Sequence, residues 1–184
     1  MNVAQLLVRW RVRMGYPLAI LVLWVSRPVP RSILSGAILG AIGLFVRARA
    51  AGYLHKQEVL TVSGPYAYTR NPLYLGSAFL TLGVAVAARS WMAAAILCGY
   101  FALVYGVVMR REEQELWQLH GAAFDEYARS VPLFLPRLTA AKLLSASSGV
   151  FSLAQYKKNR EYRAAIGFLL VLIGFLVIWR LRLP

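Results

Sequence analysis

The sequence is poor in the side chains that most often carry covalent cross-links, metal ions or catalysis. Its 184 residues contain one cysteine, two histidines and seven acidic residues. The single cysteine, Cys98, lies inside an apolar run and excludes a disulfide framework or a Cys-rich metal site. His55 and His120 lack the spacing of metal ligands, so we expect no metal. Phosphate-binding glycine loops, GxGxxG segments and Ser/His/Asp arrangements are not recognisable.

Apolar and basic residues are abundant instead. Hydrophobic residues make up 59% of the chain, and the mean hydropathy is +0.57. These values exceed those of a soluble domain and indicate a multi-pass membrane protein. The net charge of +14 would suggest nucleic-acid binding in a soluble protein. Because the basic residues stand at the ends of apolar runs, membrane topology explains them better, and we expect no nucleic-acid partner.

The apolar runs predict a polytopic all-α helical bundle with about five transmembrane helices. We interpret residues 1–184 as a single membrane domain. The first two runs are short, so they are either tilted spans or a hairpin that does not fully cross. The runs cover residues 14–26, 33–46, 73–88, 91–109 and 164–179. The expected parts are an N-terminal helical hairpin (1–50), a motif-bearing catalytic core (51–137) and an amphipathic segment with the last transmembrane helix (138–184).

The distribution of charge predicts an orientation. With a cytoplasmic N-terminus and five crossings, only five basic residues face outward, whereas the other sixteen and all seven acidic residues face the cytoplasm. This is the positive-inside asymmetry of membrane proteins. The five outer residues are Arg27, Arg31, Arg89, Arg180 and Arg182. We expect no cleavable signal peptide, because no small-residue cleavage site follows the first apolar run.

Small residues in the second apolar run predict close helix packing. Gly36 and Gly40 form a GxxxG pair, with Gly43 nearby. Such a pattern usually serves packing and has no catalytic role. The same glycine face is also compatible with a dimer, and the sequence leaves the oligomeric state open.

Two polar segments flank the predicted hairpin of residues 73–109. The first, residues 64–76, is aromatic and turn-rich, and the second covers residues 110–116. An antiparallel helix pair brings its two outer ends together, so both segments should meet at the cytoplasmic face. Arg70, Glu112 and Glu113 then converge there. Taken singly, each of these charges is equally compatible with a topology signal.

Other residues of the first segment have two interpretations. Asn71 precedes Pro72 and suits the N-cap of a helix, while a helix N-terminus can also hold an anionic group. Tyr66, Tyr68 and Tyr74 are compatible with an interfacial aromatic belt or with stacking on an aromatic ligand. Similarly, the two glutamates either accept hydrogen bonds from a ribose or amino group or balance Arg110 and Arg111.

Four short motifs in this order resemble the isoprenylcysteine carboxyl methyltransferase and phospholipid methyltransferase superfamily. The matching residues are Gly64-Pro65-Tyr66-x-x-x-Arg70-Asn71-Pro72-x-Tyr74-x-Gly76, Glu112-Glu113-x-x-Leu116, Gly121-x-x-Phe124-x-x-Tyr127 and Val131-Pro132-x-x-x-Pro136. Members of this superfamily are integral-membrane enzymes that use S-adenosyl-L-methionine. The match covers roughly residues 55–137.

The resemblance implies a cytosolic cofactor pocket built from these segments. The implied S-adenosyl-L-methionine-binding residues are Val59, Leu60, Thr61, Tyr66, Asn71, Pro72, Leu73, Tyr74 and Glu112. The implied catalytic residues are Arg70, Asn71, Glu112 and Glu113. The expected partners are membrane lipids and a membrane-embedded, prenylated or small acceptor substrate.

Two positions depart from the superfamily pattern. Asn71 stands where a histidine is usual, so a role that needs a titrating side chain is absent there. Val108 stands where the carboxyl methyltransferases have a substrate-binding arginine, which puts prenylcysteine specificity in doubt.

The identity of the acceptor stays open among a carboxylate, a lipid amine such as phosphatidylethanolamine, and a thiol. An amine must lose a proton before it accepts a methyl group, and no obvious base lies in the motif. This slightly favours a carboxylate or thiol acceptor. Glu112, Glu113 or water remain possible bases. The basic residues 157–163 either attract an anionic substrate or lipid headgroup or simply anchor the last helix.

Two other classes remain as alternatives. Membrane sterol reductases have a similar Gly-x-Tyr and Arg-x-Pro string but use NADPH, and they lack the Glu-Glu-x-x-Leu segment seen at residues 112–116. A non-enzymatic membrane scaffold would not explain why polar side chains gather at only one end of the 73–109 hairpin.

Overall fold

The computed structural model describes residues 3–55, 59–141 and 149–182. Within these residues every regular element is a helix, as the sequence predicted. The elements are α1 (Val3–Val25), α2 (Pro30–Tyr53), the 3-10 helix η1 (Gly64–Ala67), α3 (Pro72–Ala88), α4 (Trp91–His120), α5 (Ala122–Ser130), α6 (Leu153–Lys158) and α7 (Tyr162–Leu181).

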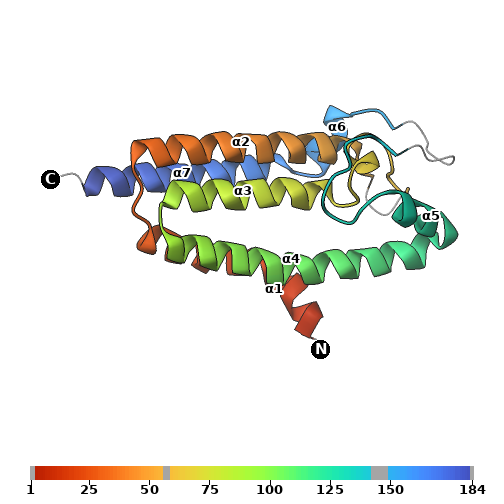
Figure 1. Ribbon diagram of the computed structural model, residues 1–184, viewed down its shortest axis with the longest axis horizontal. Helices are drawn as coiled ribbons and strands as arrows, with labels where there is room; N and C mark the ends of the chain where they lie inside the picture. Colours follow the sequence, from red (N-terminus) through yellow and green to blue (C-terminus); the bar gives the residue numbers. More distant parts are fainter. Residues whose placement is uncertain (1–2, 56–58, 142–148, 183–184) are drawn as a thin grey trace.

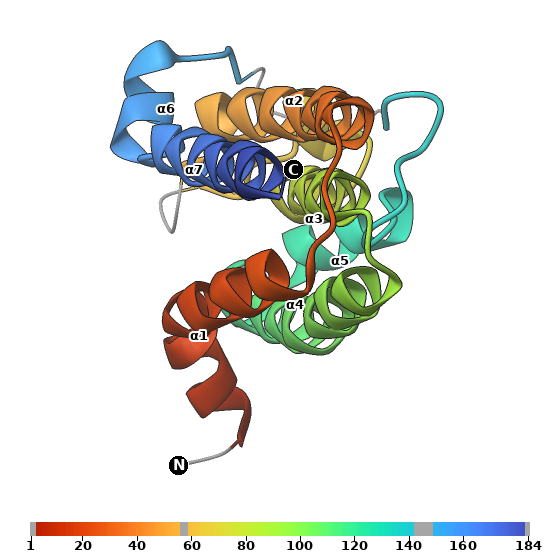
Figure 2. The same ribbon diagram turned by 90° about the vertical axis from the view of Figure 1, so that its left-hand side faces the viewer.

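The five long helices run side by side along the long axis of the molecule (Figure 1). Helices α2, α3 and α7 form one group, and α1 and α4 lie next to it (Figure 2). The short elements η1, α5 and α6 gather at one end, where α2 and α4 end and where α3 and α7 begin. We call this the polar end. The opposite end, with the connections at residues 26–29 and 89–90, is the turn end.

Three of the long helices are long and apolar enough to cross a membrane, namely α2, α4 and α7. The apolar part of α1, Met14–Val25, and helix α3 fall short of that length. The structure therefore confirms an all-helical bundle with three candidate membrane-spanning helices among the described residues, whereas five complete crossings stay a prediction.

Helices α2 and α3 pack through glycines on both sides. A Cβ on Gly36 would collide with the Gly83 carbonyl oxygen, and one on Gly43 would lie 2.6 Å from the Gly76 carbonyl oxygen. The packing predicted from the GxxxG pattern is thus present, and its partner is α3 of the same chain. Gly40 contacts the ring of Phe168 from α7, so this face is already covered within the monomer.

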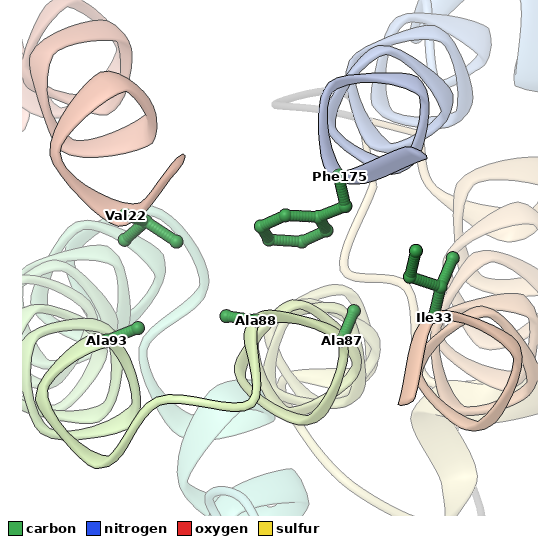
Figure 3. Packing of buried hydrophobic residues seen from close by; sticks show 6 residues of the cluster. All are labelled: Val22, Ile33, Ala87, Ala88, Ala93 and Phe175. Carbon is green, nitrogen blue, oxygen red and sulfur yellow. The ribbon is translucent and has the colours of Figure 1, made fainter. Parts of the chain in front are cut away.

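An apolar cluster at the turn end joins all five long helices (Figure 3). Its buried members are Val22 of α1, Ile33 of α2, Ala87 and Ala88 of α3, Ala93 of α4 and Phe175 of α7. The Phe175 side chain points between the other helices and is 0% exposed. The alanines let the helices approach, and the single phenylalanine fills the space between them.

The turn end carries the five arginines that the charge count places outside. The Arg27 N–H donates to the Ala88 carbonyl at 2.8 Å, and the Arg182 guanidinium donates to the Ser26 carbonyl at 2.5 Å. The connections and the end of α7 are therefore tied together. The membrane side on which this end lies stays a prediction.

Several helix boundaries differ from the apolar runs. Helix α2 continues to Tyr53, seven residues beyond the second run, because the residues from Arg47 to Ala51 are good helix formers. Helix α4 continues through both glutamates to His120 and stops at Gly121, whose φ is 48°. Residues 110–127 have the apolar spacing of an amphipathic helix, and the structure divides them between α4 and α5.

Candidate functional site

The segment before α3 forms a compact turn at the polar end. Gly64 has a φ of 60°, a conformation that glycine adopts without steric penalty. The Tyr53 ring, at the end of α2, lies against this glycine, so a Cβ there would also collide. Pro65 follows as an early residue of η1, where its missing N–H costs nothing. These features explain why this Gly-Pro pair opens the segment.

The chain after α5 holds this turn in place through backbone hydrogen bonds. The Arg70 N–H donates to the Pro132 carbonyl at 2.9 Å, the Arg137 N–H to the Tyr68 carbonyl at 2.9 Å, and the Ala141 N–H to the Ala67 carbonyl at 2.9 Å. The closing Val-Pro motif of the sequence therefore pairs with the opening Gly-Pro-Tyr motif.

A tyrosine of α5 adds a buried side-chain contact to this clamp. The Tyr127 hydroxyl donates to the Tyr66 carbonyl at 2.9 Å. Tyr127 also packs with Val62, Phe124 and Val131 in a small apolar cluster at the polar end. Its burial raises the pKa of the Tyr127 hydroxyl, so the group stays a protonated donor at neutral pH.

The Arg70 side chain joins α4 to α5. Its Nη2 lies 2.7 Å from Glu113 Oε1, and its Nη1 donates to the Ala128 carbonyl at 2.7 Å. Both partners of the ion pair are mostly buried, with side chains 14% and 23% exposed. The Arg70 Nε is buried and has no hydrogen-bond partner among the described residues.

Glu112, one residue earlier, points to α3. The Tyr74 hydroxyl donates to Glu112 Oε1 at 2.7 Å. The Tyr74 ring packs edge-on against Tyr105 of α4 at 5.2 Å between ring centroids. Phe101 stacks on Tyr105 at 4.7 Å, and it approaches Phe134 at 6.2 Å. An aromatic row thus extends from the glutamate toward the apolar part of the bundle.

Asn71 behaves differently from the prediction that its side chain caps α3. The helix does begin at Pro72, but Asn71 makes no side-chain capping hydrogen bond. Its Nδ2 donates to the Leu133 carbonyl at 3.0 Å. The Thr69 hydroxyl, which is buried, donates to the Phe134 carbonyl at 2.9 Å. The polar residues beside Pro72 are therefore used to hold the closing motif.

The three residues expected on the adenosine side lie along the connection from α2. Val59 is 56% exposed, Leu60 packs against the apolar cluster around Val62, and the Thr61 hydroxyl oxygen accepts from the His55 N–H at 3.3 Å. Pro72 is buried at the start of α3. All the sequence-predicted site residues thus lie at the polar end of the bundle.

Sequence reasoning missed an arginine–glutamate pair beside α3. Arg47 of α2 donates from Nε and Nη2 to Glu161 Oε2, at 3.0 and 2.7 Å. The side chains are 18% and 11% exposed. Arg47 Nη1 donates to the Ser77 hydroxyl and to the Leu73 carbonyl. Glu161 is the only acid within the basic stretch 157–163, and this isolation was the available signal.

Glu161 is positioned because the chain before it caps the end of α2. Asn159 Nδ2 donates to the Ala51 and Leu54 carbonyls at 2.8 and 3.0 Å. Gln155 Nε2 donates to the Leu54 carbonyl. These bonds satisfy carbonyl groups that a helix end leaves without partners. They fix the start of α7, and with it the carboxylate of Glu161.

Several ionisable groups surround Tyr66. Burial raises the pKa of the Tyr66 hydroxyl well above its usual value, and the neighbouring Tyr127, Glu161, Glu112 and Tyr74 raise it further. Two arginines, at 47 and 70, face three glutamates, at 112, 113 and 161. Carboxylates gathered in this way can accept hydrogen bonds from the cationic or polar groups of a ligand.

Comparison with known proteins gives a family for this arrangement. The family model described as phospholipid methyltransferase matches residues 29–123, slightly more than half of the chain. The chain belongs to the phospholipid methyltransferase family. The matched part of this family member covers α2, η1, α3 and α4. It stops before most of α5 and before Glu161.

Two curated relatives carry names from metal resistance. The cobalt-zinc-cadmium resistance protein CzcN of Cupriavidus metallidurans is 34% identical over 140 residues, which cover 71% of this chain and 63% of the relative. The nickel-cobalt-cadmium resistance protein NccN of Alcaligenes xylosoxydans xylosoxydans is 31% identical over 138 residues, covering 74% and 62%. The chain thus spans less than two thirds of each relative's length. No solved structure matches the chain.

Within the described part of the chain, no three His, Cys, Asp or Glu side chains lie together as a possible metal site. The glutamates of the candidate site contact arginines and a tyrosine instead.

Proposed function

We propose that this chain is a membrane-bound methyltransferase that uses S-adenosyl-L-methionine and modifies a membrane-embedded or lipid-like acceptor. The observation that carries the proposal is the meeting of Tyr66, Tyr74 and Glu112 with the Arg70–Glu113 pair at one end of the bundle. Membership of the phospholipid methyltransferase family supports the same chemistry.

The residues present fit such a cofactor in charge and in hydrogen-bonding capacity. S-adenosyl-L-methionine carries a sulfonium, an ammonium and a carboxylate, so it is positive overall. Glu112, Glu113 and Glu161 at the polar end suit its cationic groups. The buried Arg70 Nε has no hydrogen-bond partner among the described residues, and it is a donor of the kind that a carboxylate recruits. When bound, the cofactor supplies a methyl group on a positively charged sulfur.

The protein's own side chains would chiefly bind the cofactor and the acceptor and orient them for the transfer. Tyr74 holds the Glu112 carboxylate in one position by a 2.7 Å hydrogen bond. Arg70 fixes the end of α4 through Glu113, and Asn71 fixes the segment at Leu133. Methyl transfer depends on aligned approach and exclusion of water more than on acid–base chemistry. A rigid, partly buried site next to the lipid therefore suits this reaction.

This proposal accounts for more of the chain than the alternatives do. The Glu112-Glu113 pair, which sterol reductases lack, makes two different contacts, one to Tyr74 and one to Arg70. A scaffold would have no use for glutamates gathered near the buried Tyr66. The family match favours methyl transfer over NADPH chemistry.

The direct test is transfer of labelled methyl groups into lipid. Purified protein in vesicles made from a membrane lipid extract is incubated with methyl-labelled S-adenosyl-L-methionine, and label in the organic phase is counted. Glu112→Gln should reduce the rate by about tenfold or more, which corresponds to about 1.4 kcal/mol. Glu115→Gln, in an exposed pair with Arg111, is the matched control and should change little. Absence of labelled lipid with the wild-type protein would contradict the proposal.

A further inference from the structure

A cavity of about 250 Å³ lies between α2, α6 and α7 at the polar end. Its apolar lining comes from Leu44, Phe45 and Ala48 of α2 and Ala165 of α7, and its polar lining from Arg47, Tyr156 and Glu161. Phe45 is 67% exposed, so the cavity opens on the apolar outer surface of two candidate membrane spans. It is smaller than most pockets for whole ligands, which measure roughly 300–1,000 Å³.

The N–H groups of Arg47, the arginine that lines this cavity, already donate to other groups of the protein. Its Nε and Nη2 both donate to Glu161 Oε2, and Nη1 donates to the Leu73 carbonyl and the Ser77 hydroxyl. A Cβ on Gly76 would collide with the Arg47 side chain, which shows how closely the arginine crosses α3. Arg47 therefore acts as a positioning residue that fixes Glu161, with little donor capacity left for a ligand.

Glu161, by contrast, has one carboxylate oxygen that accepts no hydrogen bond from the described residues. Both bonds from Arg47 go to Oε2, and no described residue donates to Oε1. A carboxylate normally accepts several hydrogen bonds, and a mostly buried one gains from each. Because Glu161 lines the cavity and is 11% exposed, Oε1 is the acceptor that the cavity offers to a ligand.

We propose that this cavity binds the head of a membrane amphiphile that donates an N–H or O–H hydrogen bond to Glu161 Oε1, with its chain leaving past Phe45 into the lipid. The inference rests on the proposed function, because it gives the place where the methyl acceptor is recognised. The sequence slightly favoured a carboxylate or thiol acceptor, and this cavity argues against the carboxylate. A carboxylate head would face the negative charge of Glu161 with no free arginine to offset it.

The cavity adjoins the site around Tyr66. Glu161 is among the charges that raise the pKa of the Tyr66 hydroxyl, and Glu112 and Tyr74 are others. Arg47 contacts Leu73 and Ser77 on α3, one turn from Tyr74. A head held at Glu161 therefore lies beside the cofactor residues rather than on a remote surface.

The test uses cysteine protection in the full-length protein. Cys98 is replaced by alanine, and a single cysteine is placed at the cavity mouth (Phe45→Cys) or, as a matched control, at Ile42→Cys. Ile42 is 44% exposed on the same helix and does not line the cavity. The rate of maleimide labelling is measured in phosphatidylcholine nanodiscs containing octadecylamine, octadecanol or stearate.

Octadecylamine should slow labelling of Phe45→Cys several-fold, octadecanol should slow it less, and stearate should leave it unchanged. The order follows from the greater strength of a charge-assisted hydrogen bond. No amphiphile should protect Ile42→Cys. Adding Glu161→Gln should abolish the protection. Ala165→Phe, which fills the cavity and leaves the ion pair intact, should abolish it too, even if Glu161→Gln does not fold.

Protection by stearate equal to that by the amine would overturn the inference, as would protection that survives both Glu161→Gln and Ala165→Phe, or no protection at all. The assay needs neither the cofactor nor methyl transfer. If no amphiphile protects Phe45→Cys although methyl transfer is intact, the cavity is not part of the acceptor site. If octadecylamine protects Phe45→Cys but no methyl transfer is found, only the proposed function is contradicted.

Discussion

Tyr66 and Tyr127 are the two residues of the site whose ionisation the fold disfavours most clearly. Both hydroxyls are removed from water, and nearby carboxylates add to the raised pKa of each. A phenol that ionises less readily when folded stabilises the fold only while it stays protonated. Stability from these groups is therefore fully present below about pH 10, the usual tyrosine pKa, and is lost as the pH rises toward the folded-state pKa.

The first prediction concerns alkaline pH. The melting temperature in detergent should be steady in the neutral range and fall above about pH 10, because the unfolded chain then releases protons more readily. Tyr66→Phe should make this fall shallower. Tyr16→Phe, which removes a hydroxyl from a side chain that is 70% exposed, is the control. If the melting temperature falls equally steeply with pH in wild type and Tyr66→Phe, the Tyr66 hydroxyl is not buried as the structure shows.

The second prediction concerns the Tyr127 hydroxyl at neutral pH. Tyr127→Phe leaves the Tyr66 carbonyl without its donor inside a buried cluster. The expected loss in unfolding free energy is about 1–3 kcal/mol. Tyr68→Phe, at a tyrosine that is 39% exposed, should cost less than about 0.5 kcal/mol. Equal thermal shifts for the two variants would show that the hydrogen bond contributes nothing.

Contacts between site residues could be predicted from the sequence only where the pairing of two helices brings the residues together. Arg70, Glu112 and Glu113 flank one hairpin, so their convergence follows from helix pairing alone. Asn71 occupies the expected N-cap position of α3, but its side chain makes no capping bond. It donates instead to Leu133, a partner 62 residues away that no local pattern indicates. The Arg47–Glu161 pair, separated by 114 residues, left no periodic pattern to detect.

At the scale of elements, the closest packing is that of α2 on α3. Small residues let two helix backbones approach, and van der Waals contact then replaces the hydrophobic effect that is missing in lipid. The pattern around Gly36 predicted this face, but not its partner. The matching glycines of α3, Gly76 and Gly83, stand seven residues apart and do not form a GxxxG pair.

The third prediction tests this interface. Gly36→Ala places a methyl group against the Gly83 carbonyl, a backbone atom that cannot move aside cheaply. Overpacking of this kind typically costs about 1–3 kcal/mol. Gly106→Ala is the matched control, because nothing lies within 4 Å of its Cβ position in α4, and alanine favours a helix by about 1 kcal/mol. Thermal unfolding should thus shift downward for the first variant only. If Gly36→Ala unfolds at the wild-type temperature, α2 and α3 do not pack as closely as the structure shows.

At the scale of the molecule, the bundle separates two kinds of end. The turn end holds short connections and five arginines, while the polar end holds the site, α5 and α6 (Figure 1). Charge counting and hairpin geometry predicted this division. The role of residues 149–161 was not predicted, because their packing on the end of α2 depends on side-chain bonds from Asn159 and Gln155 to backbone carbonyls. The sequence also predicts a loop at residues 145–149, of which only Gly149 lies among the described residues.

The fourth prediction is the orientation in the membrane. In a Cys98→Ala background, single cysteines at Trp91, which is 90% exposed, and Leu138, which is 100% exposed, mark the turn end and the polar end. A membrane-impermeant maleimide added to intact cells should label Trp91→Cys. It should label Leu138→Cys only after the cells are opened, because the basic polar end stays inside. The reverse pattern would invert the topology.

Binding of S-adenosylhomocysteine to the purified protein tests the central claim, a methyl-donor site at the polar end, most directly. A ligand at 100 times its Kd should stabilise the fold by about 2.7 kcal/mol, whereas NADPH should give no shift. Glu112→Ala and Tyr66→Ala should lose the shift and remain folded, and Glu115→Ala should keep it. The account would be contradicted by no shift with S-adenosylhomocysteine, by a shift with NADPH, or by normal binding in both site variants.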